Sequence, residues 1–212
     1  MNIFFLHRSP RKAARYAVDK HVVKMLLETC QLLYTCHHAT GSTIVQHAPF
    51  KKGTTTPGYK KLNPNHPCGK WLRQSSIHYL WLSSYGIALL AEYNHRYTPK
   101  ADHACAEHIR WLHYNPPPFL AHTGWHTPAL AMPDIYKSPN PVASYRRYYL
   151  GEKQHILKWT KRHVPHWVPN GVPNGITPPS PLQTSPLRST SDTEIHRDRS
   201  SLETVLSSAS PS

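Results

Sequence analysis

Residues 10–38 read PRKAARYAVDKHVVKMLLETCQLLYTCHH, and this stretch decides the fold class. Ser9 and Pro10 form a typical helix start, with a capping hydroxyl followed by proline in the first turn. Apolar and small side chains then recur at steps of three and four residues, at Val18, Val22, Met25, Leu26, Thr29, Leu32, Leu33 and Cys36. One such stripe predicts a single amphipathic helix from about residue 10 to residue 38.

The rest of the body is also helical in pattern. We expect helices over residues 75–97 and 98–114, a short one after Asn140 and Pro141, and another near residues 154–161. On the 75–97 helix, Glu92 and Arg96 are spaced to pair at the surface. Its predicted inner face consists of Leu80, Ile87, Ala88 and Ala91. Residues 41–70 form a predicted long loop, and residues 3–6 would be a strand without a partner. The chain is therefore predicted to be all-α, a small compact helical domain with long loops.

The C-terminal part differs in composition. Residues 168–175 repeat turn signals, and residues 177–212 contain many Ser, Thr and Pro and no aromatic side chain. Such a segment buries too little surface to offset its ordering entropy. We therefore divide the chain into a basic helical domain, residues 1–168, and a linker with a disordered tail, residues 169–212.

The charge points to the class of partner. The chain has 25 Lys and Arg against 11 Asp and Glu, a formal net charge of +14. Residues 177–212 hold 3 Arg and 4 acids, so residues 1–176 hold 22 basic and 7 acidic residues, a net +15. A basic folded surface indicates nucleic acid, and we expect DNA rather than RNA. No apolar run approaches the ~20 residues of a membrane helix, so we expect no membrane partner. We also expect the protein to be a monomer.

The cysteines indicate the compartment. Cys30, Cys36, Cys68 and Cys105 form no CxxC pair, which favours reduced, mostly buried thiols. The apolar run at the N-terminus is too short for a signal peptide. We expect a cytoplasmic or nuclear protein, in an infected cell if it is viral. His122 and His126 have the spacing of a metal-binding pair, but they lie in a predicted loop and no cysteine pair completes a site, so neither a metal nor another cofactor is predicted.

Two residues beside the apolar stripe are candidates for chemistry. His21 and Glu28 lie about 20° apart on one helix flank, and two turns, or ~10 Å, separate them. Glu28 is one of only 7 acids in residues 1–176. One interpretation is a surface carboxylate that offsets Lys24. The other is a catalytic carboxylate in a cleft for DNA.

The segment DKHVVKMLLE, residues 19–28, resembles the first helix of the phage-type pyrimidine-dimer DNA glycosylases (endonuclease V). That helix has Asp-x-His and, seven residues after the His, a catalytic Glu. Further similarities lie at residues 65–71, 92–97 and 145–151, in the same order. The chain is also similar to phage and large-DNA-virus proteins that begin Met-Asn-Ile-Phe.

The resemblance implies a DNA glycosylase with abasic-site lyase activity on damaged or modified pyrimidines. Its nucleophile would be an N-terminal α-amine that attacks the sugar C1′, with Glu28 as the catalytic carboxylate and His21 in support. Because Asn2 is bulky, we expect Met1 to be retained and its amine to react. A non-catalytic nucleic-acid-binding protein and a viral DNA base-modifying transferase are the alternatives, so the assignment as an enzyme stays open.

The family's phosphate-binding arginines beside the Glu have no counterparts at Asn2, Leu27 or Gln31. Basic residues elsewhere, several of them interleaved with aromatic ones, are the candidates for this role. The predicted nucleic-acid-binding residues are Arg15, Lys20, Lys24, Lys51, Lys52, Lys60, Lys61, Lys70, Arg73, Arg146, Arg147, Tyr148 and Tyr149.

Overall fold

The computed structural model describes residues 2–169. Over this range it has six α-helices, three short 3₁₀ helices and no strand, which confirms the all-α prediction. The α-helices are α1 (Pro10–Tyr16), α2 (Asp19–Ala39), α3 (Pro67–Gln74), α4 (Ser76–Tyr97), α5 (Ala106–Tyr114) and α6 (Pro141–Glu152). The 3₁₀ helices are η1 (Thr43–His47), η2 (Asp134–Tyr136) and η3 (Gln154–Ile156). No helix in the described range is long and apolar enough to cross a membrane.

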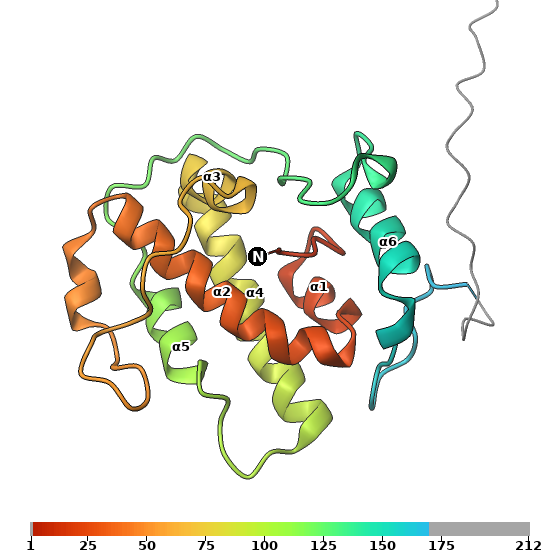
Figure 1. The fold of residues 1–212 in the computed structure, drawn as a ribbon, viewed down its shortest axis with the longest axis horizontal. Coiled ribbons are helices and arrows are strands. Elements are labelled where there is room, and N and C mark those ends of the chain that lie inside the picture. Colours follow the sequence, from red (N-terminus) through yellow and green to blue (C-terminus); the bar gives the residue numbers. More distant parts are fainter. Residues whose placement is uncertain (1, 170–212) are drawn as a thin grey trace, which may run out of the picture. The chain divides into compact units, whose positions relative to one another are not determined.

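Helix α4 is the centre of the packing. It contacts α1, α2, α3 and α5, and α2 also packs on α3 and α5 (Figure 1). Leu82, Tyr85 and Leu89 of α4 are completely buried. A long segment after α5 passes over α3 and leads to α6 (Figure 1).

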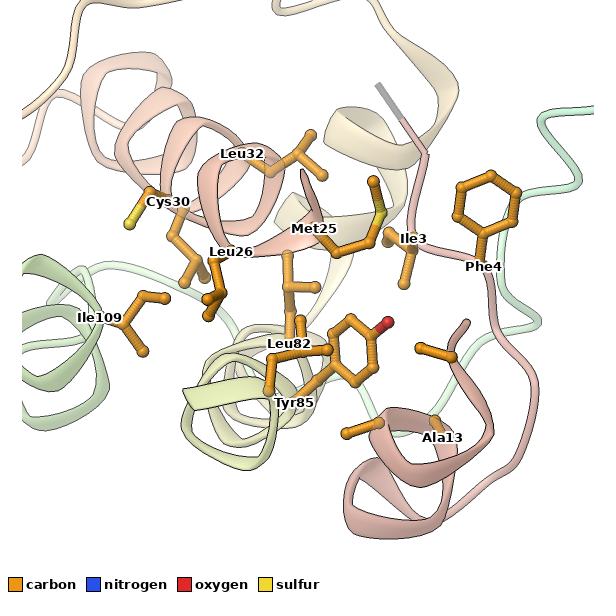
Figure 2. Packing of buried hydrophobic residues seen from close by; sticks show 14 of the residues in the cluster. Ile3, Phe4, Ala13, Met25, Leu26, Cys30, Leu32, Leu82, Tyr85 and Ile109 are labelled. Carbon is orange, nitrogen blue, oxygen red and sulfur yellow. The ribbon is translucent and has the colours of Figure 1, made fainter. Parts of the chain in front are cut away.

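The N-terminal segment is part of the core. Ile3, Phe4, Phe5 and Leu6 are all at most 6% exposed, although they form no strand. Ile3 lies beside Met25 of α2, above Tyr85 of α4 (Figure 2). The start of the chain is therefore held between α1, α2 and α6 rather than lying free on the surface.

The prediction of one long helix from residue 10 to residue 38 was wrong. The backbone is extended at Ala17 and Val18, so α1 and α2 are separate helices. Arg96 donates to the carbonyl oxygens of Arg15 and Ala17, at 3.0 and 2.8 Å. Because a side chain from α4 satisfies these helix-end carbonyls, the helix can end there. The apolar stripe continues across the break and conceals it in the sequence.

Other predicted boundaries also change. The predicted loop of residues 41–70 contains η1 and ends at Pro67, where the His66 ring caps α3 by accepting from the amide of Cys68. The predicted helix over residues 98–114 begins only at Ala106, and that over residues 154–161 shrinks to η3. The helices predicted over residues 75–97 and after Asn140–Pro141 are confirmed as α4 and α6.

The predicted inner face of α4 was wrong. Leu80 is 55% exposed, whereas the neighbouring Trp81 is 6% exposed. Glu92 and Arg96 do pair, but in the interior, at 4% and 2% exposure. The face that α4 buries is thus the one that carries Tyr79, Tyr85 and this ion pair.

The four cysteines are free and buried, as predicted. The predicted linker and tail fall almost entirely on residues 170–212, outside the described residues.

Candidate active site

The candidate site is built where the N-terminus meets α2. The backbone nitrogen of Asn2 donates a hydrogen bond to Glu28 Oε2 at 2.8 Å. Glu28 Oε1 lies 3.5 Å from Lys24 Nζ, one turn earlier on α2. The Glu28 side chain is only 14% exposed, so the carboxylate lies mostly out of water and directly against the start of the chain.

The Asn2 side chain anchors this start. Its Oδ1 accepts from the amide of Phe4 at 3.0 Å, and its Nδ2 donates to the carbonyl of Ala131 at 2.8 Å. Phe4 itself has a left-handed backbone, with φ of 49°, which costs a non-glycine residue free energy. The local turn and the contact with the 131 segment therefore fix the direction in which the chain begins.

His21 lies under this turn rather than at the surface. Its ring stacks on Phe4, with centroids 4.3 Å apart, and its Nδ1 is hydrogen-bonded to the Tyr149 hydroxyl. Burial, together with the charges of Lys153 and Lys24, lowers the pKa of His21 to about 4. The imidazole is therefore neutral at pH 7, and it can position Phe4 but cannot act as a cationic acid.

Asp19, the first residue of the Asp-x-His pattern, has a structural role. Its carboxylate accepts from the amide and hydroxyl of Thr160 and from Arg96, and Arg96 also binds Glu92. Arg162 adds two bonds to Glu92. Burial alone would raise the pKa of Glu92, but Arg162 and Arg96 outweigh it and lower that pKa. This network fixes the first turn of α2, and so the helix that carries His21 and Glu28.

The predicted lysines lie at the surface. Lys20 and Lys24 are exposed on α2, the helix of Glu28. The lysines of the 48–66 loop and the start of α3 are exposed as well, namely Lys51, Lys52, Lys60, Lys61 and Lys70. These side chains are available to phosphates. Arg15 is 46% exposed and lies 3.9 Å from Glu92.

The other predicted basic and aromatic residues are engaged within the protein. Arg73, Arg146 and Arg147 each donate to a backbone carbonyl, at Pro64, Leu6 and Tyr136 respectively. Tyr149 is completely buried, so it supports His21 and offers no face to a ligand. Tyr148 is partly exposed and stacks on Phe4.

Sequence reasoning missed Asn2 and Phe4 as parts of the site, and it predicted that Tyr149 binds nucleic acid rather than His21. It placed the nucleophile on Met1, which lies outside the described residues. The position of Asn2 beside the proposed N-terminal nucleophile could have indicated its role, because such a nucleophile requires the neighbouring residues to be anchored. Nothing in the spacing could reveal the contact of His21 with Tyr149, which lies 128 residues away.

The described residues show no cluster of three His, Cys, Asp or Glu that could hold a metal ion. The fold and the site define a basic all-α domain in which the start of the chain meets a largely buried helix carboxylate. Residues 1–104, just under half of the chain, match the model of the family described as pyrimidine dimer DNA glycosylase. The match confirms the resemblance seen in the sequence. It supports a DNA glycosylase in general, with DNA as the partner. Comparisons with curated proteins and with solved structures gave no match.

Proposed function

We propose that this protein is a DNA glycosylase with abasic-site lyase activity on damaged or modified pyrimidines. The observation that carries the proposal is the 2.8 Å contact between the Asn2 nitrogen and Glu28 Oε2. It brings the start of the chain and a carboxylate together, within the segment that matches the glycosylase family. A surface carboxylate that only offsets Lys24 would not need this contact or this degree of burial.

An N-terminal α-amine suits the chemistry. Its ordinary pKa is about 7.7–8, so a useful fraction is unprotonated at neutral pH. The amine attacks the sugar C1′ and the C1′–base bond breaks, so that the base leaves with the bonding electron pair and takes a proton from water. The C1′–O4′ bond then opens, O4′ takes up a proton, and the nitrogen lone pair forms the imine at C1′. Glu28 stabilises the positive charge that develops on the sugar and accepts the proton that the amine gives up. The low exposure of Glu28 strengthens both effects, because less water screens the carboxylate.

The amine belongs to Met1 if Met1 is retained, and to Asn2 if it is removed. Adjacent Cα atoms are ~3.8 Å apart, so the two amines differ in position by about one residue length. The nitrogen of Asn2 already lies at hydrogen-bond distance from Glu28. The proposal requires that the reacting amine, whichever residue carries it, reach this carboxylate.

His21 acts through position in this scheme. It is neutral at pH 7, stacks on Phe4 and is held by Tyr149. Exposed Lys20 and Lys24 of α2 and the lysines of the 48–66 loop and the start of α3 bind phosphates.

The test is imine trapping. The full chain is incubated with an abasic-site duplex and borohydride, and we expect a covalent adduct. Trypsin cleavage after Arg8 then releases a peptide that starts at Met1 or at Asn2, and its mass identifies the residue that carries the sugar. DNA binding without any adduct would refute the mechanism and favour a non-catalytic binding protein.

Glu28→Gln supplies the matched variant. The amide keeps an oxygen for the Asn2 nitrogen but removes the charge. We therefore expect DNA binding to persist while turnover falls by roughly 10²–10⁴-fold. Glu107→Gln removes an exposed acid from α5 and is the control, expected to match the wild type. Unchanged turnover in Glu28→Gln would remove Glu28 from the mechanism.

A further inference from the structure

A cavity of about 850 Å³ opens on the side of the N-terminal segment that carries Phe5. Its walls include Trp81 and Leu80 of α4, Trp125 and Arg8, and its rim is completed by the first turn of α6. Phe4, by contrast, faces His21 and the candidate active site. The cavity is thus separate from Glu28, which does not line it.

The aromatic wall is held in place before any ligand arrives. Trp81 Nε1 donates to the carbonyl of Arg8 at 2.6 Å, and the Trp125 ring packs against Phe5, Trp71 and His78. Trp125 nevertheless remains 44% exposed, and Leu80 55%. A rigid and accessible indole beside an aliphatic floor suits a flat heterocycle, because stacking then costs little ordering entropy.

The polar groups of the cavity suit an anionic partner. None of its lining residues is acidic, and Arg8 is its one charged residue. Over residues 2–169 the Arg8 guanidinium has no ion-pair partner. The hydroxyls of Ser84 and Thr127 also line the cavity and can donate hydrogen bonds to a base or a sugar.

A second cavity, of about 440 Å³, continues the first along α1 and α4, and the two share Pro10 and Ser84. It adds Arg11, Arg15 and Arg162. Its single acid, Glu92, is already bound by Arg162 and Arg96, and the half-exposed Arg15 lies farther from it, at 3.9 Å. Arg11 and Arg15 are one turn apart on the same face of α1, about 6 Å along the axis. A line of cations therefore leads away from the aromatic cavity.

We propose that this α1–α4 groove binds a single strand of DNA, with one unstacked base between Trp81, Leu80 and Trp125 and the following phosphates on Arg11 and Arg15. A free nucleotide would need only one cation, whereas the groove continues the positive surface past the base cavity. A fully stacked duplex could not place a base within the cavity. The choice of DNA over RNA rests on the proposed function, but the groove itself does not depend on Glu28.

Equilibrium anisotropy with a labelled eight-residue oligothymidylate and the full chain tests the groove. Trp125→Ala should weaken binding roughly 5- to 150-fold, the usual effect of losing one stacking partner. Arg11→Gln should reduce the slope of log affinity against log salt by about 0.7, the value for one phosphate contact with a single strand. Leu80→Asp, at an exposed position, should weaken binding by repelling phosphate and should leave the melting temperature unchanged.

Two variants control for general effects. Tyr114→Ala removes an 80%-exposed aromatic side chain outside both cavities, and Lys12→Gln removes an exposed charge of α1 that lines neither. Both should bind nearly as the wild type does. Equal affinity and salt slope in Trp125→Ala, Leu80→Asp, Arg11→Gln and the controls would overturn the proposal.

The test of the groove and the test of the proposed glycosylase function can fail independently of each other. Glu28→Gln should bind the oligothymidylate as tightly as the wild type. If borohydride traps no adduct but the groove variants bind weakly, the glycosylase mechanism fails and the groove stands. If trapping succeeds and the groove variants bind normally, only the groove is refuted.

Discussion

Arg96 is the residue whose loss the structure predicts to be most costly. It is 2% exposed and donates four hydrogen bonds: to Glu92, to Asp19 and to the carbonyls of Arg15 and Ala17. These bonds join α4 to the end of α1 and the start of α2. Arg96→Met keeps much of the volume of the side chain and removes all four.

The magnitude follows from what is left behind. Two buried carboxylates lose a cation, although Thr160 still donates to Asp19 and Arg162 still donates to Glu92. Two helix-end carbonyls lose their donor. Breaking a buried ion pair from one side usually costs about 3–5 kcal/mol, which for a domain of this size lowers the melting temperature by roughly 6–20 °C.

Urea denaturation at pH 7, followed by far-ultraviolet circular dichroism, measures the loss. Arg110→Met is the matched control, since Arg110 pairs with Asp102 at 2.8 Å but both side chains are half exposed. An exposed pair contributes at most about 1 kcal/mol. Arg96→Lys keeps the positive charge but lacks the several N–H donors of the guanidinium group. Its loss of unfolding free energy should therefore be smaller than that of Arg96→Met and larger than that of Arg110→Met. If Arg96→Met is within 1 kcal/mol of the wild type, the network does not hold the α1–α2 break.

Two further predictions concern a buried histidine and a glycine. Because the pKa of His21 is about 4 in the folded state and about 6.5 when unfolded, the unfolded chain binds more protons between these values, and stability falls as the pH falls through them. His21→Gln should therefore reduce the change in unfolding free energy between pH 6 and pH 5 by about 1.2 kcal/mol; an unchanged dependence in urea titrations would contradict the burial of His21. Gly58 has φ of +66°, and a Cβ there would lie 2.5 Å from Tyr34 Cε1, whereas at Gly53, with φ of +76°, no atom lies within 4 Å. Gly58→Ala should destabilise by more than about 2 kcal/mol and Gly53→Ala by about 1 kcal/mol in thermal unfolding; equal losses would show that Tyr34 can move aside.

The local signals in the sequence predicted the starts of two helices correctly, but they placed the start of α5 at residue 98 rather than at Ala106 and did not reveal the break between α1 and α2. Ser9–Pro10 and Asn140–Pro141 both begin helices, because a capping side chain and a fixed proline φ act within one turn. The break at Ala17–Val18 has no such signal. It depends on Arg96, about 80 residues away, which no periodicity can detect. The same holds for the burial of Glu92 and Arg96, whose spacing is that of an ordinary surface pair.

The site was predictable in part for a similar reason. His21 and Glu28 lie on one flank of the same helix, so the helical period of one stretch of sequence predicts their relative positions. Asn2, Phe4 and Tyr149 join them only through the tertiary fold. Arg73, Arg146 and Arg147 were counted as phosphate ligands because composition does not distinguish an exposed cation from one that binds a carbonyl.

The burial of residues 3–6 connects the two proposed sites. These four consecutive apolar residues form no strand, and they add to the hydrophobic core. In the proposed mechanism their burial has a second consequence, because it holds the start of the chain against Glu28. Phe4 does so on the His21 side, and Phe5 packs against Trp81 and Trp125 on the other. A DNA strand bound in the groove would contact Phe5, which is three residues after Asn2, whose nitrogen binds Glu28. Binding there and chemistry at Glu28 would act on the same segment of the protein.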